Sequence, residues 1–447
     1  MTAPTKEFLL LSFDHPQQAV SSVAGRMAAG LTCLGLNARV LHLPADAAEL
    51  ARLGSEQVAG ILSLGPLPLA TRVEGEVLWR RFKVPVSVYL LDAVLYDLAR
   101  VPVMRDFLAD AVADGRLGLI SPEAGYREWL AEAVPVRWQH LPFGAFPALG
   151  ALAEPVAPQQ RLCVVGHVGN ELGGGQAGES LEALLQRTLQ HFTDATARAR
   201  VAEALRAPHA HAMPARTVAD ALCWSPREVL VRDRLAALVA IDSWVKRERR
   251  LQAVESLREL PVDFFGTGWD RLLPAGPHWR HVGQIAHGDI ARLLPHYQAL
   301  VNFDPNWAHG VHDRVYTAAA MGCPVLTNHN SGLDAAGLPE SLVWRYDANR
   351  PDLATLVEEA GWLHRPALAR SPGEAVLARH NWASRMIEWV QAEDSHVPAD
   401  ADQQEAASQR LRLGAPTLKV VTGAGAPTPA WRAPRLPRGV STAVCPV

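Results

Sequence analysis

The feature that most constrains this chain is the alternation of short apolar runs with stretches of helical periodicity. Phe8–Phe13 is a short, almost wholly apolar run, which is typical of a strand buried on both faces of a parallel sheet. The next stretch, Gln17–Leu34, repeats apolar residues at helical spacing and ends at Gly35. Strands that alternate with helices of about a dozen residues form βαβ units and a doubly wound parallel sheet.

The same alternation runs through two long segments. In the first, the pattern predicts further strands at Ala38–Leu43, Val58–Leu64, Val84–Leu91, Leu117–Ile120 and Arg137–Leu141, with helices that include Glu74–Phe82 and Pro102–Asp114. In the second, it predicts strands at Arg161–Gly166, Val262–Phe265, His281–Val282, Ala299–Phe303, Pro324–Thr327 and Leu342–Tyr346, a long helical region through Glu255, and a last helix at Pro372–Gln391. The sequence therefore predicts an α/β protein with two Rossmann-like domains.

The length of 447 residues also favours two domains, because single cores stop growing near ~250–300 residues. Pro147–Gln160 is rich in Ala, Pro and Gly and is expected to be the linker. From about Asp394 the chain becomes polar and then proline-rich, which is typical of a disordered tail. The expected division is 1–146 for the N-terminal domain, 161–392 for the C-terminal domain and 394–447 for a Pro/Ala-rich tail.

Charge and composition exclude several classes of protein. The 43 Lys and Arg residues are balanced by 46 Asp and Glu residues, so no generally basic surface is available for nucleic acid. No apolar stretch approaches the ~20 residues of a membrane span, and the N-terminus does not resemble a signal peptide. The five scattered cysteines form no disulfide framework. Arginine supplies nearly all the positive charge, which indicates a bacterial high-GC codon bias. These features predict a cytoplasmic bacterial protein.

The ligand site is expected at the carboxyl ends of the parallel strands, in a cleft between the two domains. The most informative segment is 299–328, which reads as a strand, a loop with Gly310, a helix from about Asp313 and a second strand. Asp313 is expected to cap this helix. Arg314 lies in the first turn, where a cation opposes the helix dipole unless an anion binds there. We expect a nucleotide diphosphate at this point. The alternative is a surface arginine paired with a carboxylate.

Three motifs in the second segment resemble one family of enzymes. They are HDRVYTAAAMGCPVLTN, DFFGTGWDRLLP followed by WRHVGQI, and ARHNWASRMIEWV. Together they resemble the C-terminal domain of the group 1 glycosyltransferases, and most closely its CgeB-like branch. The resemblance implies a GT-B fold, in which the C-terminal domain holds a nucleotide-sugar donor and the N-terminal domain holds the acceptor, a glycan, lipid or protein. It implies no cofactor, because GT-B enzymes generally need no bound metal.

The resemblance also points to donor-binding residues. From the first motif and its loop these are Arg314, Thr317, His309, Gly310 and His312; from the glycine loop, Gly266, Gly268 and Trp269; and from the first strand of the second domain, Gly166 and His167. Trp269 is expected to stack on a base or line its slot, or else to be a core residue beside a simple turn. His309 and His312 are three residues apart but lack a third ligand for a metal.

A general base for an acceptor hydroxyl is expected at the carboxyl ends of the N-terminal strands. Asp14 and His15 follow the first strand, and Asp92 follows the fourth. Asp92 is slightly favoured, because VYLLD resembles the strand of the CgeB-like branch that ends in Asp. Each of the three residues could instead be a helix cap or a turn residue.

Two functions stay open. The first is a glycosyltransferase that moves a sugar from a nucleoside-diphosphate-sugar donor to an acceptor. The second is a GT-B-fold protein with impaired catalysis that binds nucleotide sugars or acts as a scaffold. Arg314, Gly322 and the G-x-G-W loop favour the first. The second is favoured by Thr317, which stands where the family usually has a glutamate, and by the proline-rich tail. His309 stands where related retaining transferases have the first glutamate of an E-x7-E pattern.

We predict that removal of the residues after about 396 leaves folding and donor binding intact, because this segment lacks the periodic apolar positions needed to pack. Melting temperatures of the full chain and the truncated chain, with and without nucleotide, check this. A drop of many degrees on truncation would mean that the tail packs against the domains.

Overall fold

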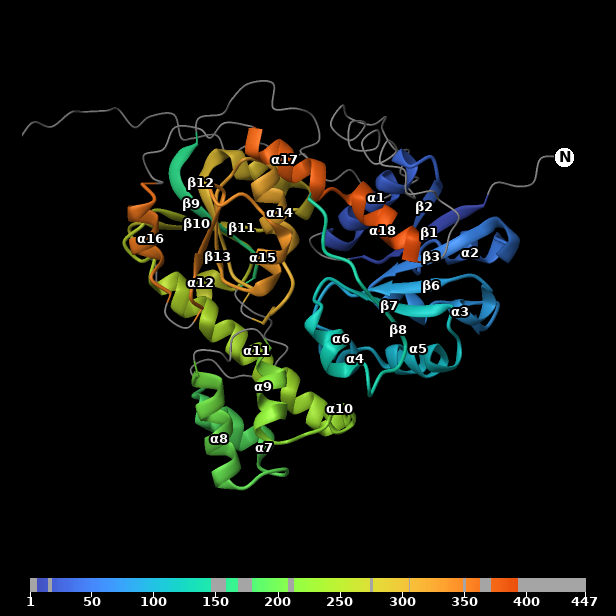
Figure 1. Cartoon of the computed structure of the whole chain (residues 1–447), viewed down its shortest axis with the longest axis horizontal. Helices are drawn as coiled ribbons and strands as arrows, with labels where there is room; N and C mark the ends of the chain where they lie inside the picture. Colours follow the sequence, from blue (N-terminus) through green and yellow to red (C-terminus); the bar gives the residue numbers. More distant parts are fainter. Residues whose placement is uncertain are drawn as a thin grey trace, which may run out of the picture. The chain divides into compact units, whose positions relative to one another are not determined.

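The structure is a computed structural model that describes residues 6–14, 18–145, 158–167, 179–207, 213–273, 276–304, 306–348, 351–361 and 371–392. Most of the expected linker and the whole expected tail, 394–447, lie outside these residues. The described part contains two six-stranded parallel sheets with helices packed against them (Figure 1). Among the described helices, none is long and apolar enough to cross a membrane.

The first sheet is built from residues 7–140. Its strands are β1 Glu7–Ser12, β2 Asn37–His42, β3 Val58–Leu64, β6 Val86–Tyr89, β7 Leu117–Ser121 and β8 Arg137–His140, in the order β2-β1-β3-β6-β7-β8. The helices between them are α1 Ala19–Cys33, α2 Ala47–Arg52, α3 Leu78–Arg81, α4 Val94–Arg100, α5 Pro102–Ala113 and α6 Gly125–Leu130. Central strands such as β3 and β6 are buried along most or all of their length, as their apolar runs predicted.

The second sheet is built from residues 159–346. Its strands are β9 Gln159–Val165, β10 Val262–Phe265, β11 Trp279–Gly283, β12 Tyr297–Asn302, β13 Val325–Asn328 and β14 Val343–Tyr346, in the order β11-β10-β9-β12-β13-β14. Its short helices are α12 Trp269–Leu272, α13 Ile290–Leu293, α14 Asp313–Ala320, α15 Ser331–Ala336 and α16 Leu353–Glu359. The strand order reverses between β9 and β12, which is where ligands bind in sheets of this kind.

A helical segment follows β9 before the chain returns to the second sheet. It comprises α7 Leu181–Leu189, α8 Ala195–Arg206, α9 Pro214–Ala221, α10 Pro226–Val229 and the long α11 Arg232–Glu255 (Figure 1). The first half of α11 packs on α4 of the first sheet, while Ala253 and Val254 join the apolar core of the second sheet. One helix therefore belongs to both cores. The fold class predicted from the sequence, an α/β protein with two Rossmann-like domains built on parallel sheets, is confirmed.

The last predicted helix is in fact two. They are α17 Ser371–Arg379 and α18 Trp382–Ala392, and the break falls where the backbone N–H of Ala145 donates to the His380 carbonyl at 2.6 Å. The Asn381 side chain then accepts the N–H of Ser384 at 2.9 Å and so starts α18. The bond from Ala145 and the cap at Asn381 thus divide a stretch whose helical periodicity is continuous in the sequence.

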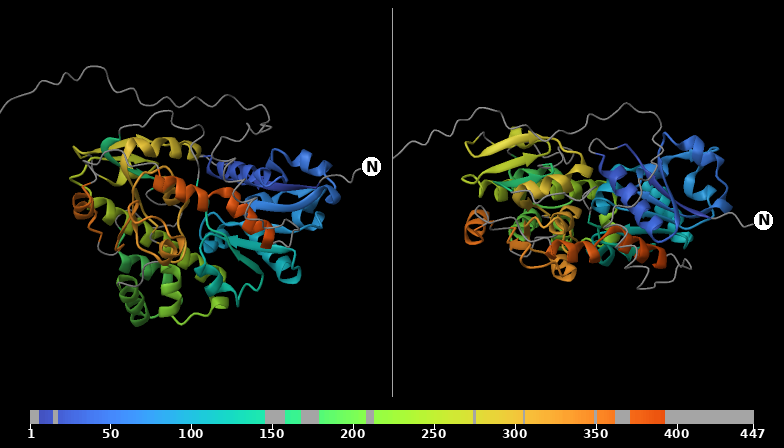
Figure 2. Two further views of the ribbon diagram at one scale, coloured as in Figure 1. Left: turned by 45° about the horizontal axis from the view of Figure 1, so that its top comes forward. Right: turned by 90° about the horizontal axis from the view of Figure 1, so that it is seen from above.

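Helix α18 packs against α1 of the first sheet (Figures 1 and 2). The two helices come so close that a Cβ atom on Gly30 would lie 3.0 Å from the Trp382 carbonyl oxygen. The Trp389 ring meets Phe8 edge-on, with ring centres 5.4 Å apart. The closing helix thus returns to the N-terminal half.

The helix predicted at Glu74–Phe82 is also shorter than expected. Only α3, Leu78–Arg81, is helical, and the residues before it form the hairpin of β4 Arg72–Val73 and β5 Glu76–Val77. Glu74 and Gly75 have φ angles of 53° and 84°, the left-handed values that a tight hairpin turn requires.

A buried hydrogen bond between α4 and α11 yields a stability prediction. Tyr96 donates to the Asp242 carboxylate at 2.6 Å. Burial raises the pKa of Asp242, and the Tyr96 bond opposes this rise. We predict that Tyr96→Phe lowers the free energy of unfolding by about 1–3 kcal/mol at neutral pH. The loss should shrink at acid pH: without its donor the carboxyl gains a still higher pKa, so the folded variant gains more from protonation than wild type does.

Urea unfolding at two pH values measures this effect. The matched control is Tyr89→Phe, because Tyr89 donates to the backbone carbonyl of Leu141 at 3.0 Å and a carbonyl does not titrate. A loss at Tyr96→Phe that does not depend on pH would contradict the prediction.

Candidate functional site

Two glycine loops meet at the carboxyl ends of β9 and β10. Gly166 and Gly266 have φ angles of 134° and 130°, values that residues with a side chain rarely adopt. A Cβ atom on Gly266 would overlap the Gly166 carbonyl oxygen. Beside them, the His167 Nδ1 atom lies 2.5 Å from the Thr267 hydroxyl. The backbones of the loops that follow β9 and β10 are thus in direct contact, because neither glycine carries a side chain.

Trp269 supports the contact between the two loops. Its indole N–H donates to the Gly166 carbonyl at 2.7 Å, and its ring packs on Phe264 with centres 5.2 Å apart. Trp269 is only 2% exposed, so its ring is not available to stack on a base. Its burial favours the other expectation for Trp269, a core residue beside a turn. The neighbouring Gly268 has a φ angle of 87° and is the N-cap of α12.

Two arginines from two helices contact the loop that follows β9, and a lysine lies one turn from one of them. Arg314, on α14, donates to the Val165 carbonyl. Arg250, on α11, donates to the carbonyls of His167 at 2.9 Å and Phe303 at 3.4 Å. Lys246 lies one turn earlier on α11, with its Nζ 3.9 Å from an oxygen of Asp92. The cluster of Lys246, Arg250 and Arg314 is called the cation cluster below.

Two members of the cation cluster, Lys246 and Arg250, are poorly hydrated. Burial lowers the pKa of Arg250 to about 10, with a further contribution from the charge of Arg314. Burial also lowers the pKa of Lys246. A shift in this direction means that the charged forms have lost more from dehydration than they gain from the carboxylates of Asp92 and Asp304 nearby. An anion bound between these cations would offset that loss.

Lys246 and Arg250 were missed by the sequence analysis. A signal was present, because Asp242, Lys246, Arg250 and Val254 are spaced four apart and lie on one face of a helix. A stripe that mixes charged and apolar residues on one helix face indicates buried charge. No local motif accompanies this stripe, so the sequence alone assigns it no role.

The loop before α14 is fixed to the first sheet. The backbone N–H of His309 donates to both carboxylate oxygens of Glu123 at 3.0 Å, and Glu123 also accepts the N–H of Gly125 at 2.9 Å. A Cβ atom on Gly310 would lie 2.7 Å from the Pro122 carbonyl oxygen. Burial raises the pKa of Glu123, and these N–H donors oppose the rise. Glu123, which follows β7, is a second residue that the sequence analysis missed.

The start of α14 differs from the expectation. Its cap is His312, whose Nδ1 lies 3.4 Å from the backbone N of Arg314, because His312 has the extended backbone that a cap needs. Asp313 is buried instead. It contacts His287 at 2.5 Å and also His312. Burial alone would raise the pKa of Asp313, but the two histidines hold it well below its ordinary value.

The other predicted residues of this region have separate places. Thr317 is buried one turn further along α14. The His309 ring lies on the Ser331 hydroxyl at 2.5 Å. Of the predicted residues on α14, Arg314 is the one that these contacts bring to the Gly166 loop, through the Val165 carbonyl.

The three candidates for the general base have different positions in the structure. Asp92 follows β6 and faces Lys246 of the cation cluster, while one of its oxygens accepts the neighbouring N–H of Ala93 at 2.8 Å. Asp14 is exposed after β1, and His15 lies outside the described residues. Within the described ranges, no group of three His, Cys, Asp or Glu side chains could hold a metal ion.

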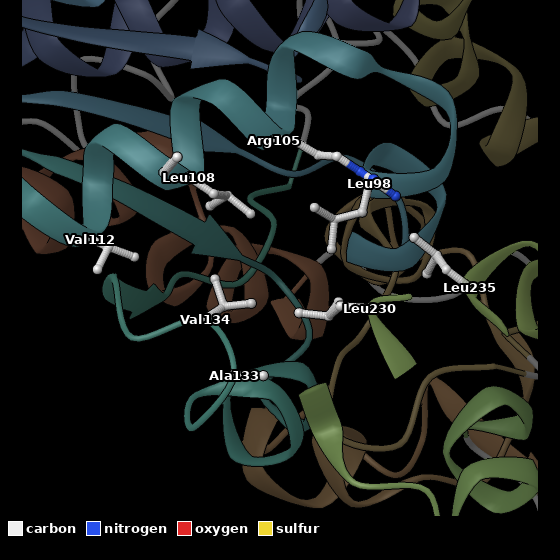
Figure 3. Close-up of a pocket in the computed structure, with 9 residues that line it drawn as sticks. Leu98, Arg105, Leu108, Val112, Ala133, Val134, Leu230 and Leu235 are labelled. Carbon is white, nitrogen blue, oxygen red and sulfur yellow. The ribbon is translucent and has the colours of Figure 1, made fainter. Parts of the chain in front are cut away.

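An apolar hollow of 290 Å³ lies on another face, between α4, α5 and the start of α11 (Figure 3). Its lining consists of apolar side chains and Arg105. None of the residues that the sequence singled out lines it.

A comparison with protein families matches one segment of the chain. Residues 246–391 match a family model described as "Glycosyl transferase-like". The match starts at Lys246 and includes Arg250, the Gly266 loop, α14 and α18. A comparison with curated proteins gave no significant match.

Several solved structures are similar to the chain at low identity. Anabaena HepE in complex with UDP and glucose is 8% identical, with 87% of this chain and 99% of that chain covered and a TM-score of 0.47. A glycosyltransferase from Rickettsia africae is 10% identical, with coverage of 87% and 98% and a TM-score of 0.45. Sucrose-phosphate synthase from Thermosynechococcus elongatus is 13% identical, with coverage of 86% and 98% and a TM-score of 0.44.

The contact between the glycine loops can be tested by substitution. We predict that Gly266→Ala lowers the free energy of unfolding by about 2–4 kcal/mol, because it adds overlap with Gly166 to an unfavourable φ. The control is Gly283→Ala, which has a φ of 101° but nothing within 4 Å of the added Cβ, and should cost about 1–2 kcal/mol. Equal losses in urea unfolding would show that the close approach of the loops does not matter.

Proposed function

We propose that this chain is a GT-B glycosyltransferase that moves a sugar from a nucleoside-diphosphate-sugar donor to an acceptor. The observation that carries the proposal is the cation cluster beside two glycine loops at the carboxyl ends of the second sheet. The family-model match over residues 246–391 supports it, because the matched segment contains the whole cluster. The cytoplasmic location, the absence of a cofactor and the domain boundaries stay predictions.

The geometry suggests how the site works. In the transfer, the bond between the sugar and the diphosphate breaks, and negative charge grows on the leaving phosphate. Lys246, Arg250 and Arg314 stabilise that charge in a site with little water, where such interactions are strongest. Gly166 and Gly266 let backbone approach the phosphates. Asp92, beside Lys246, is the candidate base for the acceptor hydroxyl, which the N-terminal half presents.

A second function has its own support. Thr317 is buried in α14 where the family usually has a glutamate, and a hydroxyl cannot grip two ribose hydroxyls as a carboxylate does. His309 stands where related retaining transferases have the first glutamate of their pattern, and its ring Nδ1 lies 2.5 Å from the Ser331 hydroxyl. These two positions favour a GT-B-fold protein that binds nucleotide sugars without transferring the sugar, or one that serves as a scaffold.

One experiment separates the two functions. Melting temperatures are measured with UDP-, GDP-, ADP- and dTDP-glucose, and the best-binding nucleotide sugar is then incubated with the protein to measure release of the nucleoside diphosphate. Binding with hydrolysis supports the transferase. Binding without hydrolysis, also with added sugar acceptors, supports the second function. If none of the four binds, the proposed function is wrong.

We predict that Arg314→Ala weakens binding of the best nucleotide sugar about ten- to a hundredfold, because a charge-assisted contact contributes about 1.5–3 kcal/mol. Arg314→Lys should restore only part of the affinity, since the planar fork of the guanidinium is lost. Calorimetric titration measures both variants.

The matched control is Arg345→Ala, which removes a surface arginine of the second sheet that pairs with Asp334. Its affinity should equal that of wild type. If Arg314→Ala also binds like wild type, Arg314 only bonds the strand-end carbonyl and the donor lies elsewhere.

A further inference from the structure

The hollow between α4, α5 and the start of α11 has apolar walls from three separate parts of the chain (Figure 3). Its volume is 290 Å³, about twice that of an apolar cavity that holds one benzene molecule. Ligand sites in proteins typically combine such walls with a few polar groups. Six of the lining residues are leucines or valines, namely Leu98, Leu108, Val112, Val134, Leu230 and Leu235.

The rim of the hollow exposes further apolar surface. Val112 is 54% exposed, and Val231, which follows the lining residue Leu230, is 52% exposed. In the part of the chain that the structure describes, only four large apolar side chains are exposed, so half of them lie at this one place. Single apolar residues are common on protein surfaces, but two beside an apolar hollow form a patch, and such patches mark binding sites.

Charged residues limit the size of this patch. Asp106 follows the lining residue Arg105 on α5, and Arg232 and Asp233 follow Val231; all three are exposed. A stable protein partner covers about 800 Å² on each chain, so it would have to cover these charges as well. A single hydrocarbon chain needs only the hollow, which has room for roughly ten carbon atoms.

The lining also carries one positive charge. Arg105 is the one charged residue among those that line the hollow, and within the described ranges it forms no ion pair or hydrogen bond. Figure 3 shows its side chain extending from α5 toward Leu98 of α4. Arginine covers apolar surface with its methylene groups while its charge stays in water. The guanidinium at the rim is thus placed to pair with a carboxylate, which matches its planar fork.

We propose that the hollow binds a medium-chain fatty acid, with a hydrocarbon chain of roughly ten carbons against the apolar walls and the carboxylate at Arg105. The volume limits the length of the chain, and the charge of Arg105 selects an anionic head. The proposal does not depend on the proposed function, because no residue of the cation cluster lines the hollow.

Titration of the full chain with hexanoate, octanoate, decanoate and tetradecanoate, each below its micelle concentration, tests the size of the site. Affinity should rise about two- to fourfold for each added CH₂ group up to roughly ten carbons, and little beyond, because a longer chain extends into water. NMR spectra of labelled leucine and valine methyl groups locate the ligand. Decanoate should shift the signals of the six lining leucines and valines.

Two variants test the walls and the head separately. Ala109→Trp should weaken decanoate binding about tenfold or more, because the indole fills the hollow from an exposed position of α5. The matched control is Ala99→Trp, which places the same ring at an exposed position of α4 that does not line the hollow. It should bind like wild type. Arg105→Ala should weaken decanoate binding about two- to fivefold, since an exposed ion pair contributes little, and leave binding of 1-decanol unchanged.

Several results would overturn the proposal. They are the absence of saturable decanoate binding, shifts confined to methyl groups elsewhere, affinity that keeps rising to tetradecanoate, and equal affinities of Ala109→Trp and Ala99→Trp. Equal weakening of decanoate and 1-decanol by Arg105→Ala would refute the carboxylate site. A wild-type dimer in sedimentation that Ala109→Trp dissociates, without decanoate binding, would make the hollow an interface between two copies. If Ala109→Trp does not fold, the methyl shifts and the Arg105→Ala titrations still decide the matter.

Discussion

The site depends on one helix that is packed into both halves of the molecule. Along one face of α11, Asp242 meets Tyr96, Lys246 meets Asp92, Arg250 meets the ends of β9 and β12, and Val254 enters the core of the second sheet. Because a helix is stiff, apolar packing at its two ends fixes the cations in its middle. The hydrophobic cores therefore position the charged groups, and the charges need no flexible loop to place them.

Such placement has an energetic consequence. Lys246 and Arg250 lose hydration, and their lowered pKa values reflect this loss. Strand-end carbonyls satisfy Arg250 in part, because a parallel strand presents its last carbonyls toward the site. A carbonyl dipole compensates a full charge only incompletely. The cation cluster thus contributes less to the free energy of folding than apolar side chains in the same place would contribute. An anionic ligand bound beside these cations would offset the difference.

The sequence predicted the parts of the structure that local patterns encode. Buried strands such as Val58–Leu64 and the short helix from Asp313 follow from periodicity, and the glycines mark the close backbone contacts. Long-range contacts were missed. Glu123 and Arg250 belong to the site only because distant segments meet, and the stop at His380 depends on Ala145, more than two hundred residues earlier. The sequence favours Asp313 as the cap, but the extended backbone of His312 makes that residue the cap.

The cation cluster also bears on the choice between the two functions. A pure scaffold has no use for charges that have lost hydration at the ends of parallel strands, as those of Lys246 and Arg250 have. Their presence argues that the site binds a phosphate-bearing ligand, whether or not transfer follows. In the transferase that we propose, the other side of the site matters as well, because Asp92, the proposed base, has an oxygen 3.9 Å from the Lys246 Nζ. A phosphate that engages Lys246 would share this ammonium group with Asp92, so the proposed donor site and the proposed base meet at one cation.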